Sequence, residues 1–260
     1  MRIILYIYLV ISGAGQLWSQ TTFQPKPLTE SRKGIVYNKE LTFDFTAHTN
    51  GYAFGVSWGK IATYYKTNYY YAGFGEIKHP KEYRQNFKYI NTLTGEASKS
   101  FVYGKQNNFF LLRAGKGFKR YYTEKAKEKG VAVGISFEAG ATLGLLKPYY
   151  LELTRFQDSA RPRLSSERYS DENKDVFLDI TRIFGSSGLL KGVGQMSFVP
   201  GIHARLGTHF EWGAYEEFIK ALEVGVMVDV FTRSIPLMVN QQNRPFFVNL
   251  YITLQLGKRT

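Results

Sequence analysis

The stretch ALEVGVMVDVF, residues 221–231, decides the class of fold. Its apolar side chains fall on every second position, at Leu222, Val224, Val226, Val228 and Val230. The positions between them hold Glu223, Gly225, Met227 and Asp229. Successive side chains of a β-strand point to opposite faces. The pattern therefore predicts a strand with one wholly apolar face and one face that carries two carboxylates.

The same period of two recurs in other parts of the chain, each time with a continuous apolar face. The segments are 40–48, 51–60, 67–76, 107–118, 130–141, 199–212 and 245–257. Together with 221–231 they predict eight strands of roughly ten residues each. A length of 260 residues fits one domain, and an aromatic content of 16% excludes a disordered chain.

The second face of these strands distinguishes a soluble sheet from a membrane barrel. In a soluble sandwich that face meets water, whereas here it holds glycine, small residues, tyrosine and isolated charges of both signs. Small residues fit the interior of a narrow barrel, so we expect an all-β fold, an eight-stranded antiparallel transmembrane β-barrel. A periplasmic sandwich or soluble barrel is the alternative. Aromatic residues near the strand ends would form the interfacial belts: Tyr52, Trp58, Phe118, Trp212, Phe231 and Phe246.

The connections between the predicted strands alternate in length. One set comprises 48–51, 77–100, 145–196 and 232–245, and the other comprises 60–67, 119–129 and 213–217. Bacterial barrels place their long loops outside the cell, which fits the first set if the N-terminus is periplasmic. The turn HTNG (48–51) is short and has Asn-Gly at its centre, which predicts a tight hairpin.

Charged residues on the second face predict a network inside the barrel. An interior of this width is filled by side chains, and charges buried there must be paired. The expected network contains Asp44, Arg113, Glu138, His203, Arg205, Glu223 and Asp229. A proton or solute path lined by Glu138, Glu223 and Asp229 is the alternative.

Enzymatic activity and cofactor binding are not expected. A lipid hydrolase of this fold would need a base, an orienting acid and a nucleophile near one rim, for which the chain offers His203, His209, Glu211 and Ser136. No serine motif flanks the two histidines. On one strand they would lie about 20 Å apart, too far to share a metal ion.

The third long loop, 145–196, is expected to contain a short amphipathic helix. Ser170 is a candidate N-cap and acidic residues follow it. The apolar residues at helical spacing are Val176, Phe177, Ile180, Ile183 and Phe184. This helix would serve either as a lid on the barrel mouth or as an arm that docks on another protein.

The N-terminus predicts export. Arg2 precedes an apolar run, Ile3 to Ile11, and small residues follow, which is typical of a secretory signal peptide over 1–19. A periplasmic segment (20–34) and the barrel (35–260) would follow, placing the protein in the outer membrane. The formal charge of +13 is spread along the chain, so we expect no nucleic-acid partner. Outer-membrane lipid, lipopolysaccharide or an acidic protein surface would account for the charge.

Three segments resemble a family of small outer-membrane β-barrel proteins of Bacteroidota. They are KQNNFFLLRAGKGF, GVAVGISFEAGATLGLLKPYYLEL and IPLMVNQQNRPFFVNLYITLQLGKR. Small barrels of this phylum are often accessory subunits of larger envelope machines, such as barrel-assembly or secretion complexes. The resemblance thus implies a non-enzymatic interaction subunit of a larger outer-membrane complex. The residue pattern leaves a lipid-modifying enzyme and a narrow conduit as alternatives.

Overall fold

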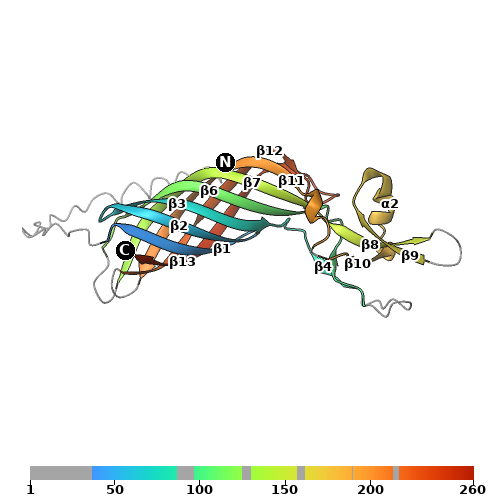
Figure 1. Ribbon diagram of the computed structural model, residues 1–260, viewed down its shortest axis with the longest axis horizontal. Helices are drawn as coiled ribbons and strands as arrows, with labels where there is room; N and C mark the ends of the chain where they lie inside the picture. Colours follow the sequence, from blue (N-terminus) through green and yellow to red (C-terminus); the bar gives the residue numbers. More distant parts are fainter. Residues whose placement is uncertain (1–36, 87–96, 125–129, 157–161, 189, 213–216) are drawn as a thin grey trace, which may run out of the picture. The chain divides into compact units, whose positions relative to one another are not determined.

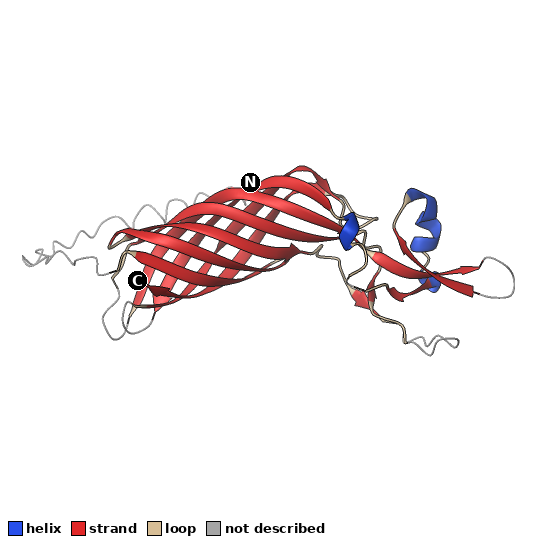
Figure 2. Ribbon diagram, in the orientation of Figure 1, coloured by secondary structure: helices blue, strands red, loops and turns tan. Residues whose placement is uncertain are grey.

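Eight antiparallel strands form a closed barrel in the computed structural model (Figures 1 and 2). The structure describes residues 37–86, 97–124, 130–156, 162–188, 190–212 and 217–260. Around the barrel the order is β1-β13-β12-β11-β7-β6-β3-β2, so each strand pairs with its neighbours in the chain and β13 closes on β1. The prediction of an all-β, eight-stranded barrel is confirmed. The expected signal peptide (1–19) and periplasmic segment (20–34) lie outside the described residues.

The barrel strands are mostly longer than the apolar alternation predicts. They are β1 (Lys39–His48), β2 (Gly51–Thr63), β3 (Lys66–Ile77), β6 (Asn107–Tyr121), β7 (Val131–Pro148), β11 (Ser197–Trp212), β12 (Phe218–Ile235) and β13 (Arg244–Arg259). β7 and β12 each span 18 residues. The additional residues lie at strand ends, where the backbone continues to pair beyond the clear alternation.

Each barrel strand buries one face and exposes the other, and β12 shows this most clearly. Glu223, Met227 and Asp229 point inward and are buried. Val224, Val226 and Val230 point outward and are exposed, and Leu222 and Val228 on the same face are partly exposed. The predicted orientation of the opening stretch is confirmed, because a strand of a closed barrel has one face inside and one outside.

Inward glycines make room for large side chains inside the barrel. A Cβ atom at Gly55 would lie 2.3 Å from a ring carbon of Tyr71, and one at Gly73 would lie 2.2 Å from the hydroxyl oxygen of the same residue. One at Gly207 would lie 2.5 Å from the hydroxyl oxygen of Tyr251. Glycine on the inner face is therefore a packing requirement, which agrees with the crowded interior expected for eight strands.

The two ends of the barrel differ in their connections. At the short-turn end the connections are 64–65, 122–130 and 213–217, and β1 begins and β13 ends there. At the long-loop end they are 49–50, 78–106, 149–196 and 236–243. The β1–β2 hairpin turns at Thr49 and Asn50, one residue before the predicted Asn-Gly centre. Gly51 has φ +155°, and its Cβ would meet the backbone oxygen of Glu76.

An apolar cluster fills the interior at the long-loop end. Phe109 and Leu111, which interrupt the alternation in the sequence, point inward and are fully buried. They belong to a cluster with Ile77, Leu146, Val199, Phe231, Ile235, Leu237 and Met238, against which Phe247 packs. The prediction that Phe231 belongs to an interfacial belt is wrong. It follows outward Val230, so its ring points inward, where it contacts Phe109 and Phe247.

The third long connection contains a small sheet, here called the loop sheet, in the order β10-β8-β9. Its strands are β8 (Tyr150–Phe156), β9 (Pro162–Arg168) and β10 (Ile183–Ser186). Between β9 and β10 lie η2 (Asp171–Asn173), α2 (Lys174–Phe177) and η3 (Ile180–Arg182), and η4 (Val193–Gln195) precedes β11. The second long connection holds the short pair β4 (Arg84–Gln85) and β5 (Phe101–Val102).

The predicted loop helix is confirmed only in part. α2 covers Val176 and Phe177, but Ile180 lies in η3, and Ile183 and Phe184 lie in strand β10. Asp179 ends the helical path, since its side chain accepts hydrogen bonds from the backbone and hydroxyl of Thr181. Ile183 then pairs with Leu153 of β8. Competition between a capping side chain and the helix backbone explains the early end.

The hairpin of β8 and β9 predicts an acid-dependent local opening. Arg155 donates two hydrogen bonds to Glu167, at 2.8 Å and 2.6 Å, and these hold the pKa of Glu167 at about 2. Because this value lies below the ordinary 4.5, the contribution of the pair is fully present above pH 4.5 and is lost as the pH falls toward 2. The amide NMR shifts of β8 and β9 in detergent are expected to follow this transition. The same transition in Glu167→Gln would contradict the assignment.

Candidate functional site

The structure places the predicted network residues inside the barrel. Asp44, Arg113, Glu138, His203, Arg205, Glu223 and Asp229 are all buried. Arg113 donates from Nε and Nη2 to the carboxylate of Asp229, at 2.9 Å and 2.8 Å. β6 and β12 are not neighbours in the barrel, so this bidentate pair spans the interior. Such pairs are among the strongest charge-assisted hydrogen bonds.

Arg205 lies at the centre of a second group of charges. The strand register places it opposite Glu138, and its guanidinium lies 3.8 Å from that carboxylate and 3.3 Å from Glu223. The rings of Tyr71 and Tyr251 flank the guanidinium with centroids at 5.3 Å and 4.6 Å. Tyr251 also donates a hydrogen bond of 2.6 Å to Glu223. Arg205 is thus surrounded by two acids and two aromatic faces.

The remaining predicted residues bind polar neighbours. His203 lies 3.2 Å from Glu138 through Nε2 and 2.9 Å from the hydroxyl oxygen of Thr142 through Nδ1. Asp44 accepts hydrogen bonds from the hydroxyls of Ser57 and Thr42. The interior therefore contains a hydrogen-bonded set rather than isolated charges, as buried polar groups require.

A further layer of charges near the short-turn end was missed from the sequence. Arg259 donates to Glu211 at 2.9 Å and 2.6 Å, and Lys119 lies 3.3 Å from Glu40. His209 lies 3.5 Å from Glu223. Lys119 shares the inward face with Arg113, and Arg259 shares it with Gln255. Extending the alternation of inward and outward positions beyond the last apolar residue of each strand predicts that Lys119 and Arg259 point inward.

The residues considered for hydrolysis do not form a catalytic arrangement in the described part of the chain. Ser136 is buried, and its hydroxyl donates to the backbone oxygen of Gly207 at 3.4 Å. His209 and Glu211 both contact the hydroxyl of Tyr121, at 3.2 Å and 2.7 Å. No hydrogen bond among these described residues joins Ser136 to either histidine. These side chains have structural partners inside the barrel instead.

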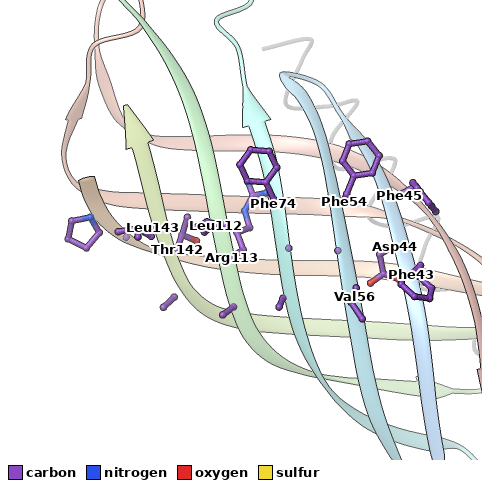
Figure 3. Close-up of a pocket in the computed structure, with 17 residues that line it drawn as sticks. Phe43, Asp44, Phe45, Phe54, Val56, Phe74, Leu112, Arg113, Thr142 and Leu143 are labelled. Atoms are coloured by element: carbon purple, nitrogen blue, oxygen red, sulfur yellow. The ribbon is translucent and has the colours of Figure 1, made fainter. Parts of the chain in front are cut away.

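Outside the charge network, the described residues offer an apolar hollow and no metal-binding cluster. No cluster of three or more His, Asp or Glu side chains among them is arranged to hold a metal ion. None of the helices in the described ranges is long and apolar enough to cross a membrane. An apolar hollow of about 760 Å³ lies on the barrel wall (Figure 3). Its lining includes the small residues Ala72, Ala114 and Ala141, which pair across β3, β6 and β7.

These features define a closed eight-stranded barrel with a charged, side-chain-filled interior and an apolar exterior. No family model and no curated protein matches the chain.

Some solved structures are similar to it. Neisserial surface protein A has a TM-score of 0.36 and 6% identity, with 86% of this chain and 96% of that chain covered. Ail, the attachment invasion locus protein of Yersinia pestis, has a TM-score of 0.36 and 8% identity, with 86% and 97% covered. The N-terminal β-barrel domain of Pseudomonas aeruginosa OprF has a TM-score of 0.32 and 8% identity, with 84% of this chain and 97% of that chain covered.

Removing one partner of the Arg113–Asp229 pair is expected to lower the free energy of unfolding strongly. Arg113→Ala would leave a buried carboxylate without its cation, which costs about 3–5 kcal/mol of the free energy of unfolding. Arg113→Met combined with Asp229→Leu should recover most of that loss. Urea unfolding in detergent, followed by tryptophan fluorescence, measures both.

Arg155→Ala serves as the control, because it breaks an ion pair in which the arginine is 41% exposed. Its cost is expected to be about 0–1 kcal/mol. Equal losses for Arg113→Ala and Arg155→Ala would contradict the role of the interior pair.

Proposed function

We propose that the protein is an integral outer-membrane barrel that acts by binding, as a non-enzymatic subunit of a larger envelope complex. The outward faces of the strands support a membrane location, since they expose apolar side chains that water would disfavour. Typical examples are Phe43, Phe54, Leu206, Val226 and Leu250. The expected signal peptide supports export of the precursor. The barrel fold supports an outer-membrane location.

The filled interior supports binding rather than transport. The apolar cluster around Phe109 occupies the long-loop end, and charged pairs such as Arg113 with Asp229 cross the interior below it. An eight-stranded barrel leaves little room beyond its own side chains. The buried, mutually paired histidines and acids also give a substrate no surface to approach, which favours a role without catalysis.

The loop sheet is the observation that carries the proposal. It has a core of its own, in which Phe101, Leu151, Leu153, Phe177 and Ile183 are buried. Phe101 comes from β5, so the second and third long connections pack together. Joining two neighbouring strands of a barrel needs only a short turn. A long loop with a packed core presents a defined surface in addition. On this surface Leu164 and Ile180 remain 41% exposed.

Further exposed apolar residues lie near the long-loop end. Leu190 is 87% exposed, Tyr83 is 71% exposed and Phe198 is 64% exposed. Exposed apolar groups rimmed by polar residues are typical of protein interaction surfaces. Barrel-assembly and protein-secretion complexes of the outer membrane are the proposed partners, with lipopolysaccharide around the barrel.

Removing the loop sheet tests this role. The backbone N–H of Ser187 donates to the carbonyl of Tyr150 at 3.0 Å, so a short Gly-Ser linker can replace Leu151–Ser186 without displacing the barrel strands. The tagged variant is expected to lose the larger outer-membrane complex that the parent co-purifies from native membranes in mild detergent. Its barrel should still be extracted in a protease-resistant form.

A turn variant at the other end of the barrel is the control. Replacing Tyr64 and Tyr65 by Asn-Gly changes the β2–β3 turn and leaves the loop sheet intact. This variant should retain the complex. Recovery of the parent as a lone barrel, or equal recovery of the complex by parent and deletion, would overturn the proposal.

A further inference from the structure

Outward charges on the barrel are distributed unevenly between its two ends. Among the described barrel strands the only outward acid is Glu76, near the long-loop end, which lies 3.3 Å from Lys78. Toward the short-turn end the outward charges are all basic and exposed. This basic collar consists of Lys39, Lys60, Lys66, Lys116, Arg120, Lys220 and Lys258.

Like charges face each other directly across strands in the collar. Lys39 pairs in register with Lys60, and Lys66 pairs with Arg120. Like charges at directly opposed positions destabilise a sheet. Within the described residues Lys258 is the one collar residue with an ion pair, at 3.0 Å from Glu217. In the part of the chain that the structure describes, no ion pair neutralises Lys39, Lys60, Lys66 or Arg120.

Two acids near the collar face the other side of the barrel wall. Glu40 and Glu211 lie on the inner face of the wall, are buried, and bind Lys119 and Arg259 there. The sheet itself separates these carboxylates from the outward cations. Among the described residues, the collar cations other than Lys258 therefore have no carboxylate within ion-pair distance, which leaves room for an anionic group from outside the chain.

Aromatic side chains accompany the collar cations. Lys66 lies over Phe118 at 5.7 Å, Lys116 over Tyr70 at 5.6 Å, and Lys258 over Phe218 at 5.8 Å from the ring centroids. Aromatic residues together with Lys and Arg are typical of the depth at which lipid headgroups meet hydrocarbon. At this depth the aliphatic stems of Lys and Arg lie against apolar surface, and their charged ends reach the headgroups.

We propose that the basic collar binds the phosphates of anionic phospholipids, with Lys66, Arg120 and Lys116 as its principal site. This inference rests on the proposed membrane location, and in that orientation the lipids belong to the periplasmic leaflet. The apolar wall beyond Lys116, which includes the hollow of Figure 3, accommodates acyl chains. A second copy of the chain fits less well, because its collar would bring further positive charge.

Trp58 reports on this site. Its ring stacks on Tyr70 with centroids 6.2 Å apart, and Tyr70 pairs in register with Lys116. A variant whose only tryptophan is Trp58 is refolded into phosphatidylcholine vesicles that contain brominated phosphatidylglycerol or brominated phosphatidylcholine. Two basic residues near a membrane surface predict a preference for phosphatidylglycerol of roughly tenfold to thirtyfold in fluorescence quenching.

Paired charge variants test the assignment. Lys66→Gln with Arg120→Gln should reduce the preference several-fold, because two of the three cations of the principal site are removed while Lys116 remains. Lys81→Gln with Arg244→Gln removes the same charge from exposed positions near the long-loop end and should leave the preference unchanged.

Each remaining outcome has one meaning. A parent preference near onefold, or an unchanged preference in the collar variant, overturns the collar proposal while the membrane location stands. Failure of both brominated lipids to quench Trp58, with a monomeric mass in detergent, overturns the membrane location itself. The same failure with a dimeric mass assigns the face to a second copy of the chain and overturns the lipid proposal.

Discussion

Burial of charge inside a closed barrel is the constraint on which the rest of the structure depends. Eight strands leave an interior that only side chains can fill, so every inward charge must find a partner there. Arg113 meets Asp229 across the interior, and Arg205 lies between Glu138 and Glu223. The inward glycines follow from the same constraint, since Gly55 and Gly73 leave the space that Tyr71 occupies beside Arg205.

Because of this constraint, the proposed function lies outside the interior. Paired charges and an apolar cluster fill the interior of the barrel. The surfaces left for binding are therefore its loops and its outer wall. The long-loop end carries a sheet with its own packed core. The outer wall carries apolar residues and, toward the short-turn end, cations of which only Lys258 has an ion pair among the described residues. We propose that the first surface binds protein and the second binds lipid.

The alternation of side chains predicts the parts of the structure that depend on one strand at a time. It predicts the number of barrel strands and the inward position of Glu223 and Asp229. It does not predict that Phe109 and Phe231 meet in one cluster, because that contact joins strands far apart in the sequence. Lys119 and Arg259 were missed because polar residues hide the ends of their strands. Ile183 and Phe184 fit a helix locally, but pairing of β10 with β8 places them in a strand.

The two faces of β12 provide the most direct test of the account. The chain has no cysteine, so single cysteines from 222 to 230 can carry a fluorophore without background. In reconstituted protein a quencher confined to the hydrocarbon should reach labels at 222, 224, 226, 228 and 230. A cysteine at 227 should resist labelling in the folded protein, because Met227 is buried and faces the filled interior. Quenching of the even-numbered positions by the water-soluble reagent would contradict a membrane-embedded barrel.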